Sequence, residues 1–222
     1  MVQELKISLP IYKIAYAAFF TVILSIVRGV TFTYEIGMAL EAPMAMLAAV
    51  FFADTYTQEI VSKRWQLQRL YPMKKRVCSI ARRMLIQQLF LWALAMMGYG
   101  LFSVFQSPLS FDMAQSSLGE ELKQFLVYSG AVFITLAFWG MLSNTIACIW
   151  RHMWFGIGGC LILWLAANSS MGVRLKGWNL FSYSFRNVEN SGDFTWMWGK
   201  MICICACVIL ATTLPGLLKE RG

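Results

Sequence analysis

Charged residues and histidine are scarce in this sequence, and their scarcity narrows the class of protein. Only 14% of the 222 residues are charged, whereas 59% are hydrophobic and 15% are aromatic. A soluble domain usually carries about 25% charged residues, because its surface faces water. A single histidine excludes a His-x-x-x-His zinc pair. The composition therefore predicts a membrane protein rather than a soluble domain.

The six cysteines provide no disulfide or metal framework. Cys78, Cys148 and Cys160 are isolated, and the other three lie in one apolar run. Helical spacing places Cys203 and Cys207 on one face and turns Cys205 away. Buried cysteine usually packs as a small hydrophobic residue, so we favour ordinary packing over metal binding.

Six long apolar runs predict the fold class, an all-α polytopic integral membrane protein. A helix needs about 20 mostly apolar residues to cross a bilayer core about 30 Å thick. The predicted spans cover about residues 12–32, 36–56, 84–105, 124–150, 153–167 and 195–214. We expect one transmembrane domain over residues 1–222, with its first span acting as the insertion signal. The polar and aromatic stretch from Asn168 to Asp193 is either an external loop or partly re-entrant.

The distribution of basic residues predicts the orientation. With both termini inside, thirteen Lys and Arg residues lie on the cytoplasmic side: Lys6, Lys13, eight between Lys63 and Arg83, Arg151, Lys219 and Arg221. Six lie outside: Arg28, Lys123, Arg174, Lys176, Arg186 and Lys200. Because basic loops are retained in the cytoplasm, we expect a multi-pass protein with N-in and C-in topology. The net charge of +8 thus reflects membrane topology, and we expect no nucleic-acid partner.

The first cytoplasmic loop carries the most informative pattern. Its sequence from Glu59 to Pro72 reads EIVSKRWQLQRLYP and predicts an interfacial helix. Trp65, Leu67 and Leu70 belong to its apolar face, and Lys63 and Arg64 to its polar face. Pro72 would end this helix, since proline disfavours helical conformation in the residue before it.

This loop resembles the type-2 permeases of ATP-binding-cassette exporters. In that family an acidic residue follows the second span, and a proline stands thirteen positions later, as Glu59 and Pro72 do here. The basic stretch leading into the third span and the six-span layout also agree. One departure is Lys63, because the family often has glycine four residues after the acid. The alternative interpretation of the loop is a positively charged anchor that binds anionic lipid.

The resemblance implies a coupling function for Glu59, Lys63, Arg64, Trp65, Leu67, Leu70 and Pro72. In the family, this segment docks on a cytoplasmic ATPase subunit. It further implies a second permease copy or a paralogue, and a location in the cell membrane of a bacterium among its lipids. The sequence has no G-x-x-x-x-G-K-[ST] motif, so ATP and Mg would be bound by the partner subunit, and this chain would hold no cofactor.

The implied substrate is a hydrophobic or amphipathic molecule. An antimicrobial or lanthionine peptide is our specific hypothesis, with a drug or a lipid as the other choices. The 14 methionines and 16 phenylalanines could line an adaptable path, but membrane packing explains the same composition.

Two intramembrane charges predict a link between the first two spans. Arg28 lies about 22 Å along the first helix from Lys13, and Glu41 lies about 20–22 Å along the second from its cytoplasmic end. Ionisable groups at such depth are rare and commonly paired. We therefore expect an ion pair between Arg28 and Glu41, against the alternative that Arg28 reaches external headgroups and Glu41 sits in water.

The sequence contains few residues that could form a catalytic site. His152 stands beside Arg151 in a short turn and is interpreted as an interfacial residue. Glu120, Glu121 and Ser129 are the candidates for an intramembrane enzyme. We expect a transport subunit and not an enzyme. A non-transporting immunity or assembly factor is the other alternative.

Overall fold

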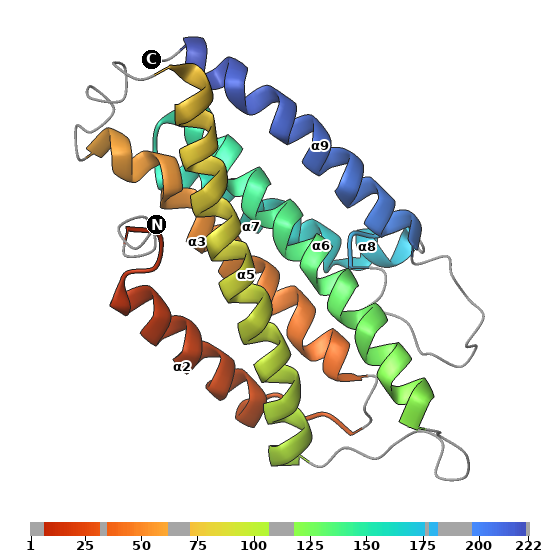
Figure 1. Cartoon of the computed structure of the whole chain (residues 1–222). Helices are drawn as coiled ribbons and strands as arrows, with labels where there is room; N and C mark the ends of the chain where they lie inside the picture. The colour runs from red at the N-terminus through yellow and green to blue at the C-terminus, as the bar shows by residue number, and fades with distance from the viewer. Residues whose placement is uncertain are drawn as a thin grey trace.

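The computed structural model describes residues 7–31, 35–61, 72–106, 118–175, 178–181 and 197–220. Every regular element in this part of the chain is a helix (Figure 1). The helices are α2 (Ile11–Val27), α3 (Glu35–Val61), α5 (Met73–Gln106), α6 (Leu118–Trp150), α7 (Met153–Ala167), α8 (Ser170–Arg174) and α9 (Met197–Glu220). The predicted all-α class is confirmed.

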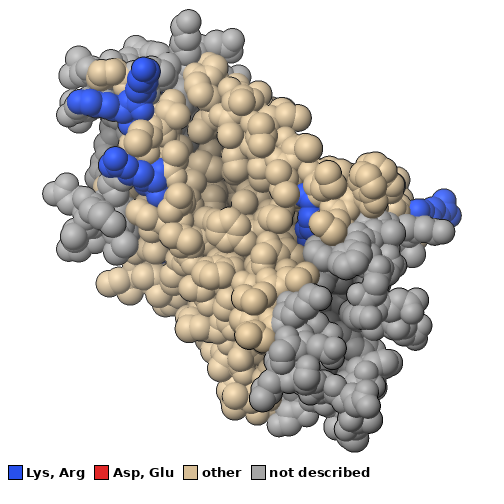
Figure 2. All heavy atoms as spheres, turned by 45° about the vertical axis from the view of Figure 1, so that its right-hand side comes forward, with Lys and Arg blue, Asp and Glu red and all other residues tan. Residues whose placement is uncertain are grey.

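Four helices are long and apolar enough to cross a membrane. Their qualifying stretches are Glu35–Thr55, Lys74–Gln106, Phe125–Trp150 and Met197–Leu217. Helices α2 and α7 are apolar but shorter, with 17 and 15 residues. On the face shown in Figure 2 the described residues are almost all uncharged, and no described Asp or Glu is visible there. These properties suggest a membrane protein.

Hydrogen bonds between helices fix the directions of the helices. Glu41 meets Thr135 and Ala49 meets Ser143, so α3 and α6 run parallel. Helix α7 follows α6 after a short turn. Cys160 of α7 donates a hydrogen bond to the carbonyl of Trp139, which precedes Ser143 on α6, so α7 runs back antiparallel to α6. The bundle therefore has two ends. We call the end at which α5 begins the basic end, and the other the far end.

Helix α3 lies at the centre of the bundle and packs against α2, α5, α6 and α7 (Figure 1). Its buried residues include Phe51 and Phe52, which are at most 1% exposed. A Cβ atom added to Gly140 of α6 would lie 2.8 Å from the ring of Phe52. Small residues let membrane helices approach closely, and here glycine makes room for an aromatic ring.

Several helix boundaries differ from those predicted, including the start of α6 at Leu118 and not 124 and the end of α9 at Glu220 and not 214. Helix α2 ends at Val27 and not at 32, because Arg28 has an extended backbone and Gly29 follows it. Helix α3 continues past 56 to Val61, and α5 begins at Met73 and not at 84. Lys and Arg are good helix formers, so the basic stretch after Pro72 extends α5 instead of forming a loop.

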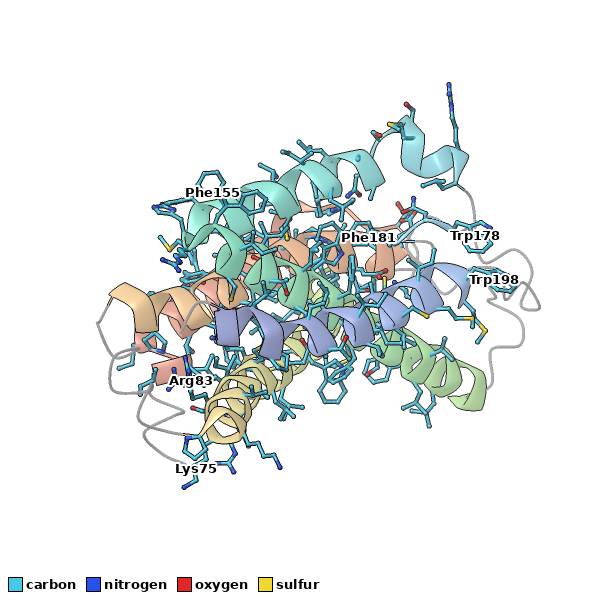
Figure 3. The ribbon with its side chains drawn as sticks, turned by 90° about the horizontal axis from the view of Figure 1, so that it is seen from above. Lys75, Arg83, Phe155, Trp178, Phe181 and Trp198 are labelled. Carbon is cyan, nitrogen blue, oxygen red and sulfur yellow. The ribbon has the colours of Figure 1, made fainter. Side chains whose placement is uncertain are left out.

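Part of the stretch from Asn168 to Asp193 packs inside the bundle. The Phe181 side chain is fully buried and stacks on Trp139, with ring centroids 5.5 Å apart and planes within 6°. Asn179 donates a hydrogen bond to the carbonyl of Ala167 at 3.2 Å. Figure 3 shows Phe181 within the bundle, while Trp178 and Trp198 lie together at its edge. The segment 178–181 therefore turns back into the helices.

Candidate functional site

A buried ion pair joins three helices inside the bundle. The Lys200 ammonium group contacts Oε1 of Glu41, and the two residues are 3% and 0% exposed. The hydroxyl of Thr135 donates to the same carboxylate oxygen at 2.5 Å and accepts from Lys200 at 2.7 Å. Lys200 also donates to the carbonyl of Leu180 at 3.2 Å. We call Glu41, Thr135 and Lys200 the buried triad.

Each member of the buried triad comes from a different helix. Glu41 lies in the second turn of α3, Thr135 in the middle of α6, and Lys200 in the first turn of α9. The triad therefore lies closer to the far end. Segment 178–181 adds the Leu180 carbonyl from the same end. Burying a charge is costly unless it is paired and hydrogen-bonded, and this arrangement provides both conditions.

The predicted pairing of Arg28 with Glu41 is wrong, because the structure pairs Glu41 with Lys200. Arg28 Nη1 donates to the carbonyl of Ala39 at 3.3 Å. Ala39 and Glu41 are two positions apart on α3 and thus point about 200° apart around the helix. The depth of Arg28 was matched correctly to that of this helical turn, but Glu41 faces α6 and α9.

Pro43 explains why the Ala39 carbonyl needs a donor. It lies inside α3, and proline has no backbone N–H with which to bond the carbonyl four residues earlier. That carbonyl belongs to Ala39. The Arg28 guanidinium thus supplies the hydrogen bond that Pro43 removes from the helix.

Aromatic and sulfur-containing side chains surround the triad. Trp139 follows Thr135 by one helical turn, and it packs with Phe181, Cys160 and Cys203 in one buried cluster. Cys203 is buried, Cys207 is half-buried and Cys205 is exposed, which confirms the predicted faces. Within the described residues, no group of three or more His, Cys, Asp or Glu residues is placed to hold a metal ion.

A second ion pair lies near the basic end. Lys13 Nζ contacts Asp54 Oδ1 at 2.5 Å and donates to the Phe51 carbonyl at 3.2 Å. The Lys13 ammonium also lies 5.3 Å from the centroid of the Phe51 ring. This pair fastens the beginning of α2 to the latter half of α3.

Buried hydrogen bonds beside this ion pair join α5 to α3 and to the residues before α2. Gln87 accepts a hydrogen bond from Thr55 at 2.9 Å and donates to the Ser8 carbonyl at 3.1 Å. The residues before α2, the core of α3 and the first half of α5 are thus linked by buried polar contacts.

The residues considered for catalysis are scattered. The Ser129 hydroxyl accepts a hydrogen bond from the Trp92 indole at 3.2 Å. His152 is exposed, accepts from the Trp154 N–H at 3.4 Å and lies edge-on to Phe155. The side chains of Glu120 and Glu121 lie outside the described residues. The intramembrane-enzyme alternative therefore gains no assembled constellation from the described part of the chain.

We call Glu59 to Pro72 the coupling segment, and the structure describes only its two ends. Glu59 lies in the last turn of α3, although its side chain is outside the described residues, and Pro72 is exposed directly before α5. Lys63, Arg64, Trp65, Leu67 and Leu70 lie outside the described part of the chain. Their function stays a prediction.

Comparison with known proteins adds no relative. No family model, no curated protein and no solved structure matches this chain.

Sequence reasoning found Glu41 but missed Lys200 and Thr135. Lys200 was assigned to the external side, although it lies inside the predicted sixth span at 195–214. An ionisable residue within an apolar run was the available signal. Thr135 gave no signal, because hydroxyl side chains are ordinary in membrane helices.

Proposed function

We propose that this chain is the membrane-spanning permease subunit of an ATP-binding-cassette exporter. It would move an amphipathic or hydrophobic substrate, such as a lanthionine peptide, with ATP hydrolysed by a separate subunit. All six main helices would cross the membrane, with α2 and α7 about 25 and 22 Å long, near the lower limit for a span.

The continuity of α3 is the observation that carries this proposal. The helix continues from the buried triad to Val61, beyond the first residue of the coupling segment, and Pro43 removes only the backbone hydrogen bond to the Ala39 carbonyl. Eighteen residues separate Glu41 from Glu59, or about 27 Å along a helix. A displacement of the loop would therefore reach the ion pair through one central helix, as a permease driven by an external motor requires.

The two ends of the bundle support the proposed orientation. Lys74, Lys75 and Arg82 are exposed at the basic end, which would face the cytoplasm. Trp178 and Trp198 stack with centroids 5.4 Å apart near the far end. Tryptophan is enriched at membrane interfaces, so this pair is suited to the outer boundary. Figure 3 shows Lys75 and Arg83 toward one end and the two tryptophans at the other.

Co-purification tests the proposal directly. The chain is extracted in mild detergent, bound proteins are identified, and ATPase activity is measured with and without candidate peptides. We expect an ATPase subunit and two permease chains per complex. Leu67→Pro should remove the ATPase subunit or its stimulation while membrane insertion is retained. Ser116→Pro, in the opposite predicted loop, is the control and should keep both.

Two results would reject this function. If no ATPase accompanies the native chain, an immunity or assembly factor is the better assignment. If Leu67→Pro keeps both complex formation and stimulated hydrolysis, the loop is a membrane anchor and not a coupling segment.

A further inference from the structure

Helix α9 lies along one side of the bundle, where it packs on α6 and touches α5 (Figure 1). From Met197 to Ala211 its buried residues are Gly199, Lys200 and Cys203. All three belong to the first two turns of the helix. The close packing of this stretch is therefore concentrated at the far end of the bundle, and the turns that follow are exposed or half-buried.

Lys200 attaches the beginning of α9 to three other parts of the chain. It contacts Glu41 of α3, donates to the Thr135 hydroxyl of α6, and donates to the carbonyl of Leu180. Hydrogen bonds weaken steeply once their geometry is lost, so these contacts are either made or broken. We call them the latch.

The opposite part of α9 contains features that loosen or bend a helix. Pro215 lies inside the helix and has no N–H for the carbonyl of Ala211. The hydroxyls of Thr212 and Thr213 donate back to carbonyls three residues earlier, at 2.8 and 3.0 Å. Proline and such hydroxyl contacts are recognised causes of helix bending. We call residues 211–216 the hinge.

The two sides of the hinge are held differently. Leu214 is 8% exposed and belongs to the main buried cluster, to which α3, α5 and α6 also contribute, so this end of α9 is anchored in the bundle. Lys200 lies about 16 Å along the helix from Ala211. A bend of about 20° at the hinge would move Lys200 by about 6 Å, which is enough to break every contact of the latch.

Release of the latch leaves neither charge in hydrocarbon. Lys200 follows the exposed Trp198 by two residues, or about 3 Å along the helix, and a long lysine side chain can reach the membrane interface from there. Glu41 lies in the second turn of α3 at the same end. Both groups can therefore be hydrated when α9 moves, which lowers the cost of separating them.

We propose that α9 is a gate at the far end of the bundle, with Lys200 as its latch and residues 211–216 as its hinge. Opening would separate the beginning of α9 from α6 and uncover the buried cluster that contains Trp139 and Cys203. The latch and the hinge follow from the contacts of α9 alone. The trigger through α3, and the use of the opening by an amphipathic substrate, rest on the proposed exporter function.

Three native cysteines report whether the gate opens. Cys203 is 0% exposed on the inner side of α9, Cys205 is exposed on the same helix, and Cys148 is 2% exposed in α6. The chain in detergent is treated with N-ethylmaleimide, and mass spectrometry gives the rate at each cysteine relative to the denatured chain. Local opening exposes Cys203 without Cys148, whereas global unfolding exposes both. We expect Cys205 to react fastest, and Cys203 to react at least about tenfold faster than Cys148.

Variants of the latch should raise the ratio of the Cys203 rate to the Cys148 rate. Lys200→Met strands Glu41 in the closed form and should increase the ratio by at least about tenfold. Thr135→Val removes one hydrogen bond of the latch and should increase it by about fivefold. The second variant serves if Lys200→Met does not fold.

Variants of the hinge should lower the same ratio. Pro215→Ala restores the N–H donor to the helix, and Gly216→Ala adds a better helix former where a Cβ would meet nothing within 4 Å. Each should reduce the ratio by about threefold or more. Gly130→Ala in α6 is the matched control, because a Cβ there also meets nothing within 4 Å, and it should leave the ratio unchanged.

Equal relative rates for Cys203 and Cys148 in the native chain would refute the gate, since α9 would then leave only on global unfolding. An unchanged ratio in both latch variants would refute the function of Lys200. Hinge variants that behave like Gly130→Ala would refute the hinge. The experiment needs no ATPase, so these results leave the exporter function to its own test. Absence of an ATPase partner would remove the trigger and not the gate.

Discussion

Lys200 and Glu41 form a buried ion pair although 159 residues separate them in the sequence. The pair joins the first turn of α9 to the second turn of α3, and Thr135 of α6 bridges the two charges. Removing one charge strands the other in an apolar interior, whereas removing both leaves no unpaired charge. The pair is therefore a constraint on how the last helix docks.

A mutant cycle measures this constraint. Glu41→Gln and Lys200→Met should each destabilise the chain by about 3–5 kcal/mol, and the double variant should cost clearly less than their sum. Thermal unfolding in detergent gives the three values. Additive effects would show that the two side chains do not interact.

The same cycle on Arg28 and Glu41 should behave differently. Arg28 contacts Ala39 and Glu41 contacts Lys200, so we expect Arg28→Ala and Glu41→Gln to add within about 0.5 kcal/mol. Coupling well above this value would restore the pairing inferred from depth alone.

Arg28 and Pro43 should be coupled through the Ala39 carbonyl. Arg28→Ala should cost about 1.5–3 kcal/mol in the native background, the usual contribution of a hydrogen bond to a charged group. In a Pro43→Ala background the helix regains its N–H donor, so the same change should cost markedly less. Unfolding of the four chains compares the two costs. Equal costs would mean that Arg28 acts elsewhere.

Two glycines of α7 offer a matched packing test. A Cβ on Gly156 would lie 2.5 Å from the Ser143 carbonyl oxygen, whereas one on Gly158 would meet nothing within 4 Å. Gly156→Ala should therefore destabilise by about 1–3 kcal/mol through overpacking between α7 and α6. Gly158→Ala should be neutral or slightly stabilising, because alanine is the better helix former. Similar Tm values for the two variants would contradict the close approach of these helices.

Cysteine accessibility tests the orientation. An impermeant thiol reagent applied from outside should label cysteines placed at Ser116 or Ser191, and not at Gln66 or Lys219. The native Cys78, which is exposed near the beginning of α5, should react only after permeabilisation and serves as the internal control. External labelling at Gln66 would invert the topology and remove the coupling segment from the cytoplasm.

The predicted spans and the observed helices agree best at the turn between the fourth and fifth spans. The fourth span was expected at 124–150 and the helix is Leu118–Trp150, while the fifth was expected at 153–167 and is found at Met153–Ala167. The boundary between them follows from Arg151, whose positive φ of 56° breaks the helix between two apolar runs. Agreement is poorer at 84, because hydropathy marks where a helix becomes apolar and not where its hydrogen bonding begins.

The apolar composition, the spacing of the runs and the side chains' positions along them were determined by the sequence alone, because hydrophobicity and helix rise are local properties. These properties identified Glu41 as a deeply placed charge and matched the level of Arg28 to the adjacent turn of α3. The choice of Lys200 as the partner of Glu41 was decided only by the tertiary structure. Neighbouring helices are selected by packing, here by Gly140 on Phe52 and Gly156 on Ser143, and that selection depends on the shapes of distant segments together.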